Sequence, residues 1–573
     1  MRQEWSVRAR GKIPACLQKY PPAIASLLAQ RGIKTKPQLE GFLCPDFEKD
    51  LHDPFLLLGM NRAVARIKKA IIRKEPITLF GDYDADGVSG TAILEAVLRR
   101  AGTVIKSIYI PDRHQEGYGL NETAVRQIAK GGSKLIITID CGITDVAEVK
   151  LAQALGVEVV ITDHHHVWPK VPKAVAIVNP HQPKDRYPFK ELSGAGVAFK
   201  LGQALLADLE VPGYLNFLKW QLDLVALATV ADCVSLLGEN RTLVKYGLLV
   251  LAQTRRFGLR ELLRVAGIKP VCDVQNLCTN LDSFALGFML APRINAAGRM
   301  EHANTAYDLL VTESENEARW LAQRLDDKNK ERQSETEKLI RQTESGLKNL
   351  KKAALIFAGG ANYASGILGL VAGRLADRYF KPAFIFGQDG ELVKGSARAP
   401  EGFNLIAALE KSKALFVEFG GHPRAAGFVL RQENLGRLEE ALNKAMRQQA
   451  AQLPPPVLCI DVELELADRK KLADVWHFLE KCAPFGQDNE EPVFLSKNLM
   501  VKNSRNVGNG EGHLKLDLAN QKGDIFPAIG FGLAPRAAEA PIGSQLDVVY
   551  KILPDEWNGE KRLSLKLVDF KVI

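Results

Sequence analysis

Between residues 60 and 180 the chain alternates short apolar runs with segments of helical periodicity. Five runs have the length and composition of buried strands: 77–80, 103–110, 134–139, 157–162 and 174–179. Helical segments lie between them, and two of these, 91–102 and 146–156, end on a glycine as helices commonly do. This alternation predicts an α/β fold with a parallel sheet that is covered by helices on both faces.

Residues 190–310 have mostly helical periodicity, and the segment 312–349 that follows is strongly polar. Thr312 and Glu315 have the spacing of a capping box, which predicts a helix start. No large apolar residue occurs between Leu325 and Leu339. We therefore expect a helix that has no core face in this part and bridges two lobes, with a span of roughly 50 Å. A disordered linker is the alternative.

A second, smaller α/β segment follows the polar stretch, with strand-like runs AALIFAG and PAFIFG. The sequence LPPPV then marks a stiff domain boundary. Beyond it, one helix and several short alternating runs predict a small β-barrel. The expected parts are an N-terminal segment 1–55, an α/β domain 56–311, a bridging helix 312–350, a second α/β domain 351–452 and a barrel domain 453–573.

Composition narrows the class of protein only slightly. A chain of 573 residues is too long for one core, and its formal net charge of +9 favours a polyanionic partner without identifying one. The eight cysteines are scattered without a CxxC pair, which argues against a zinc ribbon or a disulfide framework. Since no apolar signal segment or 18-residue apolar run occurs, we expect a cytoplasmic protein without a membrane span.

The segment GDYDADG places aspartates at alternate positions, 82, 84 and 86, directly after a predicted strand. Such closely spaced negative charges are costly to order without a cation among them. A calcium-binding loop is excluded, because its twelfth position requires a glutamate and Ile93 stands there. That motif also needs a preceding helix, where this chain has the strand-like ITLF.

Other metal-binding side chains follow neighbouring predicted strands. Asp140 follows one strand, Asp163 and three consecutive histidines follow the next, and Asp232 ends a helical segment. The carboxyl ends of parallel strands meet at one edge of a sheet. Carboxylates with imidazoles suit Mn²⁺ or Mg²⁺, and their number fits two ions about 3.5–4 Å apart. The sequence therefore predicts a dinuclear phosphoesterase centre, although each motif alone could be a turn, a surface cluster or a helix cap.

Four segments in this order, GDYDADG, TIDCG, TDHHH and ATVADCVSL, resemble the motifs of the DHH phosphoesterase superfamily. Five more segments resemble bacterial exonucleases specific for single-stranded DNA within that superfamily: 111–121, 290–300, 394–405, 419–428 and 482–494. The similarity extends over nearly the whole chain. It implies a DHH catalytic domain, a bridging helix, a DHH-associated domain and a C-terminal OB-fold barrel.

The resemblance further implies a 5′→3′ exonuclease that releases mononucleotides from single-stranded DNA in recombination and repair. It would use two Mn²⁺ or Mg²⁺ ions. The implied metal ligands are Asp84, Asp86, Asp140, His164, His165 and Asp232, with Asp82 and Asp163 beside them. Whether Asp82 binds directly stays open. The implied catalytic residues are Asp84, Asp140, His165 and His422.

Substrate contacts are implied by the same resemblance. A terminal 5′-phosphate would be held by Arg113, Ser396 and Arg398, and guanidinium groups suit phosphate oxygens. Tyr118 belongs to the same segment as Arg113. The expected contacts from other segments are Arg293, Asn295, Arg299, Gly420, Gly421 and His422. For the 290–300 segment a helix-capping turn is an equal alternative. The chain has Tyr363 and Ala364 where the family often has Trp-His, which leaves local contacts there open.

In the barrel, an OB-fold would hold single strands through a basic groove and stacking aromatics. Four phenylalanines are expected in the core: Phe485, Phe494, Phe526 and Phe531. The expected phosphate contacts are Lys502, Arg505, Lys515 and Lys522.

Two rival functions remain at this point: a DHH phosphodiesterase for short oligonucleotides or cyclic dinucleotides, and a catalytically inactive single-strand-binding scaffold. Family analogy suggests a monomer that works with a single-stranded-DNA-binding protein and a helicase.

Overall fold

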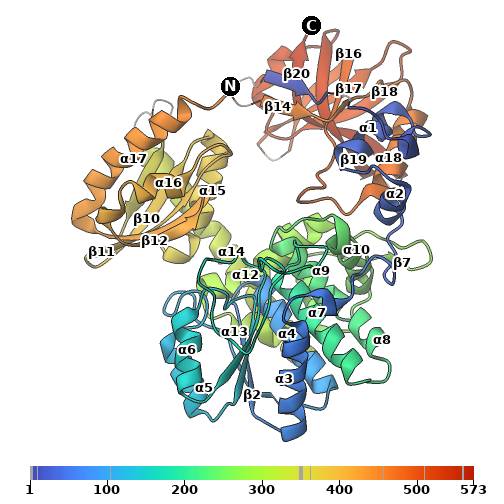
Figure 1. Ribbon diagram of the computed structural model, residues 1–573. Coiled ribbons are helices and arrows are strands. Elements are labelled where there is room, and N and C mark those ends of the chain that lie inside the picture. The colour runs from blue at the N-terminus through green and yellow to red at the C-terminus, as the bar shows by residue number, and fades with distance from the viewer. Residues whose placement is uncertain are drawn as a thin grey trace. The chain divides into compact units, whose positions relative to one another are not determined.

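The computed structural model describes residues 4–9, 11–103, 105–347, 353–361, 363–455, 457–508, 510–557 and 560–573. The chain forms two compact units (Figure 1). The first unit comprises Met1–Asp53, Cys233–Leu248 and Pro455–Ile573. The second unit comprises Pro54–Asp232 and Leu249–Pro454. No helix in the described part of the chain combines the length and apolarity that crossing a membrane requires.

The second unit begins with a five-stranded parallel sheet in the order β3-β2-β4-β5-β6. Its strands are β2 (Ile77–Gly81), β3 (Ile105–Tyr109), β4 (Leu135–Ile139), β5 (Glu158–Thr162) and β6 (Ala176–Val178). Every residue of β2 and β4 is buried, as expected for strands covered on both faces. All five predicted strands are confirmed.

Helices cover this sheet on two sides (Figure 1). On one side lie α5 (Glu122–Lys130) and α6 (Val146–Ala154); the other helices are α3 (Met60–Arg73), α4 (Ala85–Arg100) and α7 (Gly194–Asp208). The helix predicted from residue 91 begins six residues earlier, at Ala85. The reason is that Asp84 is its N-cap, and its carboxylate accepts hydrogen bonds from the backbone N–H groups of Asp86 and Gly87.

A helical part follows in the second unit. It contains α8 (Tyr214–Lys219), α9 (Leu222–Ala231), α11 (Phe257–Val265), α12 (Ala291–Met300) and α13 (Asn304–Val311). Helix α10 (Gly238–Ala252) belongs mostly to the first unit. A short hairpin of β7 (Cys272–Asp273) and β8 (Cys278–Thr279) lies between α11 and α12. A π-helical turn, Ala285–Leu290, leads directly into α12.

The polar segment forms α14 (Glu315–Gly346), 32 residues long and therefore about 48 Å in length. Two local predictions are wrong. Ser314 is the N-cap, because the Thr312 hydroxyl instead binds the Glu317 carboxylate. The helix also has a core face, since Asp326, Asn329 and Thr336 are buried. The end of the predicted helix, 348–350, lies outside the described residues.

A mixed five-stranded sheet completes the second unit, in the order β12-β13-β11-β10-β9. Its strands are β9 (Ile356–Gly360), β10 (Ala383–Asp389), β11 (Leu392–Arg398), β12 (Phe416–His422) and β13 (Ala425–Arg431). The helices of this domain are α15 (Leu368–Tyr379), α16 (Leu405–Glu410) and α17 (Leu435–Ala450). Strand β11 carries Ser396 and Arg398 at the sheet's centre.

The first unit contains a closed barrel of five strands in the order β16-β17-β18-β20-β19, in which β19 pairs back to β16. The strands are β16 (Phe494–Val507), β17 (His513–Ala519), β18 (Ile525–Gly530), β19 (Gln545–Trp557) and β20 (Glu560–Val572). Other elements of the unit are β1 (Glu4–Val7), α1 (Pro22–Gln30), α2 (Lys36–Leu43), β14 (Val457–Ile460), β15 (Val462–Glu463) and α18 (Arg469–Cys482). The predicted barrel is confirmed; Pro456 of the LPPPV boundary lies outside the described residues.

The four barrel phenylalanines do not behave alike. Phe494 and Phe526 are fully buried, as predicted, and Phe485 is partly buried against the same core. The prediction is wrong for Phe531, whose exposed fraction is 52%. Phe531 directly follows β18. The alternation that turns Phe526 and Ala528 inward places Phe531 on the outer face.

Candidate metal centre

The parallel sheet brings the predicted metal-binding residues to one edge. Asp82 follows β2, Asp140 follows β4 and Asp163 follows β5. The backbone N–H group of each donates to the last carbonyl of the neighbouring strand, so the three loops start at the same level: Ile139, Thr162 and Val178 are the acceptors. The predicted convergence of these residues is therefore observed.

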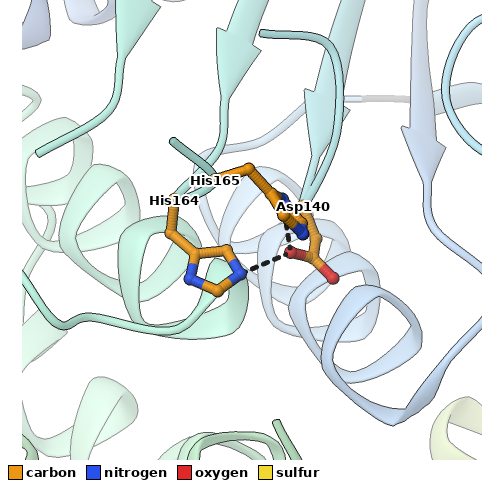
Figure 2. Close-up of side chains that lie close together, drawn as sticks. All are labelled: Asp140, His164 and His165. Atoms are coloured by element: carbon orange, nitrogen blue, oxygen red, sulfur yellow. Dashed lines mark ion pairs between the residues drawn. The ribbon is translucent and has the colours of Figure 1, made fainter. Parts of the chain in front are cut away.

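Within this edge, carboxylate oxygens and imidazole nitrogens form three overlapping groups that could hold a metal ion. The groups are Asp140–His164–His165, Asp86–His164–Asp232 and Asp82–Asp84–Asp140. His164 is shared by two of them: its Nε2 lies 3.2 Å from Asp140 Oδ1 and 3.5 Å from Asp232 Oδ2. Figure 2 shows Asp140, His164 and His165 turned toward one another.

Three buried atoms of this cluster have no hydrogen-bond partner among the described residues: Asp82 Oδ1, Asp140 Oδ1 and His164 Nε2. Buried polar atoms are normally paired. Unpaired carboxylate oxygens beside an unpaired imidazole nitrogen are the environment that a divalent cation satisfies, and the donor set suits Mn²⁺ or Mg²⁺. The residues present therefore fit the metal that the sequence implies.

Mutual repulsion and burial shift the pKa values of these carboxyl groups upward. Burial, followed by the charges of Asp86 and Asp84, raises the pKa of Asp140 well above its ordinary value. The same causes raise the pKa of Asp232 to about 9, and burial with the charge of Asp84 raises that of Asp86 to about 7. The metal-free cluster therefore holds protons near neutral pH, which a divalent cation would displace.

The two histidines differ in charge. Burial, and then the neighbouring His165, lowers the pKa of His164 to about 4, so its imidazole is neutral and available as a ligand. For His165, burial acts to lower the pKa, but the hydrogen bond and charge of Asp163 raise it to about 9. His166 lies outside the three groups, with its ring 4.7 Å from that of His181.

Asp163 is placed differently from the other carboxylates. Its Oδ1 accepts hydrogen bonds from the backbone N–H groups of His164 and His165 and lies 2.8 Å from His165 Nδ1. Its Oδ2 accepts from the backbone N–H of Ile143 at 3.0 Å. Burial acts to raise the pKa of Asp163, but these contacts with His165 lower it overall. Because both oxygens are used within the protein, Asp163 orients the DHHH loop and belongs to none of the three groups.

The N-terminus of α7 supports the cluster and was not predicted from the sequence. Asp86 accepts hydrogen bonds from the backbone N–H groups of Gly194 at 2.6 Å and Ala195 at 2.8 Å. A Cβ atom at Gly194 would lie 2.5 Å from Asp140. The sequence signal was the run Ser193-Gly-Ala-Gly, because a serine N-cap followed by small residues lets a helix N-terminus approach an anion closely.

Two residues of the 290–300 segment that are expected to contact the strand bind other parts of the protein in this structure, and their contact with the strand stays a prediction. The guanidinium of Arg293 pairs with the buried carboxylate of Asp326 at 2.9 Å, which joins α12 to α14. The side-chain oxygen of Asn295 accepts a hydrogen bond from the backbone N–H of Ala85 at 2.8 Å. Asn295 thereby holds the loop that carries Asp84.

The arginines predicted to hold a 5′-phosphate share one electrostatic environment. Arg398 donates to the hydroxyl of Ser396 at 3.0 Å, and its pKa is lowered by burial and then by the charge of Arg113. Burial, followed by Arg113, also lowers the pKa of Arg299 to about 9. Partly buried cations that repel one another favour the binding of an anion.

The remaining predicted residues lie in two places. The Tyr118 hydroxyl donates to the backbone carbonyl of Asp140 and lies 3.0 Å from His165 Nδ1, so Tyr118 borders the cluster. Gly420, Gly421 and His422 are exposed at the β12–β13 hairpin, where Gly421 has a φ of 133°. His422 belongs to none of the three metal-binding groups, and its position opposite them stays a prediction. Tyr363 stands where the family often has a tryptophan. Its hydroxyl forms a hydrogen bond with the Thr343 hydroxyl at 3.1 Å.

A parallel sheet that ends in buried carboxylates and imidazoles, followed by a second α/β domain, defines a metal-dependent phosphoesterase of the DHH class. Sequence models of three families match: the DHH family N-terminal domain over residues 76–229, the DHHA1 domain over 351–448 and the RecJ OB domain over 460–569. The third match distinguishes this chain from DHH proteins that lack such a barrel.

Full-length relatives narrow the class further. The chain is 38% identical to the single-stranded-DNA-specific exonuclease RecJ of Bacillus subtilis over 96% of this chain and 68% of the relative. It is 31% identical to RecJ of Escherichia coli, with 99% of both chains covered. A crystal structure of RecJ from Thermus thermophilus with Mn²⁺ superposes with a TM-score of 0.82 at 28% identity, covering 99% of this chain and 79% of that one. The chain belongs to the RecJ family of single-stranded-DNA-specific exonucleases.

Proposed function

We propose that this protein is a metal-dependent 5′→3′ exonuclease that hydrolyses single-stranded DNA with a 5′-phosphate to mononucleotides, in DNA recombination and repair. The observation that carries the proposal is the trio of buried, unpaired atoms on Asp82, Asp140 and His164. The similarity to RecJ over nearly the full length assigns the substrate, and the structures of RecJ with Mn²⁺ and with Mg²⁺ support either ion.

Two divalent ions held by this cluster would lower the pKa of a coordinated water and stabilise charge on the phosphoryl oxygens. The proposed ligands are Asp82, Asp84, Asp86, Asp140, His164, His165 and Asp232, with Asp163 as the group that orients His165. His164 contributes a neutral imidazole because its pKa is low. Tyr118 borders the cluster and positions His165. His422 is proposed to contact the phosphate that is cleaved.

A phosphate clamp would select the 5′ end. Burial, followed by the charge of Arg113, lowers the pKa of Arg398, and Ser396 supplies a hydroxyl beside Arg398. A terminal phosphate bound there would neutralise these cations and accept charge-assisted hydrogen bonds. Arg299 belongs to the same environment. The clamp would place the first internucleotide phosphate at the metals, so that one nucleotide is released in each step.

The clamp is tested by two matched arginine variants. Arg398→Gln should raise the KM for a 5′-phosphorylated oligonucleotide by about 10- to 100-fold, the contribution of lost charge-assisted hydrogen bonds. It should leave the KM for the 5′-hydroxyl form unchanged. Arg126→Gln is the control, because its guanidinium pairs with Glu122 on the exposed face of α5, and it should not change the preference between the two substrates. Equal effects of both variants would contradict the clamp.

Polarity and metal dependence are tested with oligonucleotides labelled at the 5′ or the 3′ end. We expect a 5′ label to leave as a mononucleotide at the start of digestion, with Mn²⁺ or Mg²⁺ and not with EDTA. A 30-mer should be turned over in preference to a dinucleotide. Preference for the dinucleotide would instead support a phosphodiesterase for short oligonucleotides, and binding without hydrolysis would support an inactive scaffold.

Partners and setting follow from the family. We propose a cytoplasmic monomer that acts with a single-stranded-DNA-binding protein and a helicase. Light scattering of the purified chain would test the monomer, and co-purification with a single-stranded-DNA-binding protein would test the partner.

A further inference from the structure

His114 lies in the loop after β3 and uses both of its ring nitrogens. Its Nε2 is 3.1 Å from the backbone carbonyl oxygen of Arg299, and its Nδ1 is 3.2 Å from the Ser365 hydroxyl. Because a carbonyl only accepts, Nε2 carries the proton, and in the neutral ring Nδ1 accepts from Ser365. His114 therefore connects three segments that are far apart in the sequence.

These segments belong to two domains of the second unit. Arg299 is in the last turn of α12, where backbone carbonyls lack partners within the helix, and His114 supplies a donor there. Ser365 begins a short 3₁₀ turn, Ser365–Ile367, that leads into α15 of the second α/β domain. Directly before it stands Ala364, where the family often has a histidine. The imidazole at this contact therefore comes from the DHH domain.

The contact is closed by Gly366. A Cβ atom at Gly366 would lie 2.3 Å from the carbonyl oxygen of Arg299 and 3.0 Å from Cε1 of His114. The guanidinium of Arg299 also donates to the Gly366 carbonyl at 3.1 Å. The two domains therefore meet here with backbone against backbone, in a space that only glycine fits.

Both parts of the proposed phosphate clamp adjoin this contact. Arg113 directly precedes His114. On the other side, Gly369 lies in the first turn of α15, and a Cβ atom there would lie 3.0 Å from Arg398 Nη2 and 3.1 Å from Ser396 Oγ. The contact of His114 with the start of α15 therefore lies between the clamp residue of one domain and those of the other.

The loop that carries Arg113 is held in a defined turn. The carboxylate of Asp112 accepts hydrogen bonds from the backbone N–H groups of His114 at 2.7 Å and Gln115 at 3.0 Å, a turn typical of aspartate. The backbone N–H of Asp112 donates to Glu116 at 2.7 Å. Because the turn is fixed internally, the position of the imidazole determines where the backbone of Arg113 lies.

We propose that His114 is a positioning residue that sets the spacing of the 5′-phosphate clamp. By holding the Arg299 carbonyl and the Ser365 hydroxyl, it fixes how far the Arg113 loop lies from the clamp residues of the second α/β domain. Guanidinium groups on two domains grip one phosphate only where both reach it. The inference rests on the proposed clamp and deepens it, because it names the contact on which selection of the 5′ end depends.

The test compares two replacements of His114 in the full chain with Mn²⁺. His114→Leu removes both hydrogen bonds, and His114→Gln keeps a donor and an acceptor. His114→Leu should raise the KM for a 5′-phosphorylated 20-mer about tenfold, as expected for the loss of these hydrogen bonds. Its kcat, and its KM for the 5′-hydroxyl form, should not change. His114→Gln should keep the KM for the phosphorylated form within about twofold of the parent value.

The matched control is His477→Leu. His477 is an exposed histidine on α18 of the first unit, where its ring pairs with Glu480. Its replacement also exchanges an imidazole for an apolar side chain, and it should change the KM for neither substrate.

Two further measurements follow the contact itself. Ser365→Ala removes one partner of His114, so adding it to His114→Leu should cause no further rise in KM, because residues that act through one contact are not additive. Hydrogen exchange of the backbone at 365–370 reports the contact without activity. Its protection should fall in His114→Leu and persist in His114→Gln.

An equal rise in KM for the 5′-phosphate and 5′-hydroxyl forms in His114→Leu, or a lower kcat with both, would overturn the positioning role. Additive effects of His114→Leu and Ser365→Ala would overturn it as well. Failure of the clamp has a different signature, because Arg398→Gln would then leave the preference for the 5′-phosphate unchanged too. If the exonuclease function failed, the parent chain itself would release no nucleotides.

Discussion

Two regions of this protein bury charge, and they do so in opposite ways. In the first unit Arg241 is almost fully buried, yet its donors reach four backbone carbonyls, those of Phe42, Lys481, Cys482 and Ala483, at 2.7–2.9 Å. In the second unit, buried atoms of Asp82, Asp140 and His164 face one another without partners. A buried charge whose partners are all supplied joins segments of the fold, whereas one left unpaired marks a place for a ligand.

The two regions also differ in how far apart along the chain their residues lie. Arg241, on α10, connects α2 and the C-terminal end of α18 within the first unit, and its guanidinium lies 4.0 Å from the ring centroid of Phe42. Its pKa is lowered by burial to about 10, so it stays charged. The metal cluster collects residues from a shorter stretch of chain, between Asp82 and Asp232, and its charges repel. The first arrangement stabilises the protein without help, and the second needs a cation.

The largest expected effect follows from removing one carboxylate of the cluster. Asp140→Ala should reduce nucleotide release more than about 100-fold, because metal ions contribute several kcal/mol to such reactions, while DNA binding is largely kept. Release measured from a 5′-labelled oligonucleotide checks this. Asp208→Asn, which changes an exposed carboxylate paired with Lys68, is the control. Full activity in Asp140→Ala would exclude this cluster as the catalytic centre.

The opposite effect is expected in the first unit. Arg241→Met should remove a donor from four carbonyls, of which that of Cys482 keeps the side-chain amide of Asn489. Each carbonyl that stays unpaired costs roughly 1–3 kcal/mol, so the barrel unit should be destabilised. Arg241→Lys should not restore stability, because one ammonium cannot replace a planar guanidinium with its spread donors. Hydrogen exchange of β16–β20 measures the change. Dinucleotide turnover, which depends on the second unit, should persist. If turnover were lost along with the hydrogen-exchange protection of the barrel strands, this separation of roles would be contradicted.

A smaller effect is expected from the ions themselves. Mn²⁺ at 100 times its dissociation constant should stabilise the second unit by about 2.7 kcal/mol through mass action. Thermal unfolding with EDTA and with Mn²⁺ measures this increment. The increment should disappear in Asp140→Ala and remain in Arg241→Met. A shift of equal size in all three proteins would mean that Mn²⁺ binds elsewhere.

The smallest expected effect is the dependence of that increment on pH. The folded-state pKa of Asp86 is about 7, above its ordinary 3.8, so the folded, metal-free protein binds an extra proton between these values. Its stability should therefore fall as pH rises through this window. Since a cation must displace the proton, the stabilisation by Mn²⁺ should be larger at pH 8 than at pH 6. Unfolding temperatures at both pH values check the sign, and a larger increment at pH 6 would refute it.

Local patterns were sufficient to predict the parallel sheet, the barrel and the convergence of Asp82, Asp140 and Asp163 at one edge. Period-two and period-3.6 patterns record which face of an element is buried, and parallel strands necessarily align their carboxyl ends. The core face of α14 between Leu325 and Leu339 escaped this reasoning, because buried polar residues such as Asp326 carry it there and apolar periodicity cannot reveal them.

Only the tertiary structure decided the partners of each polar side chain. It assigned Arg293 to Asp326, Asn295 to the loop of Asp84, and the α7 N-terminus to Asp86. It also left Phe531 exposed beside His513 and Lys566. The sequence by itself determined the elements, their order and the chemistry at the strand ends. Which charges are satisfied and which remain open depends on contacts between residues far apart in the chain, and no local pattern encodes those.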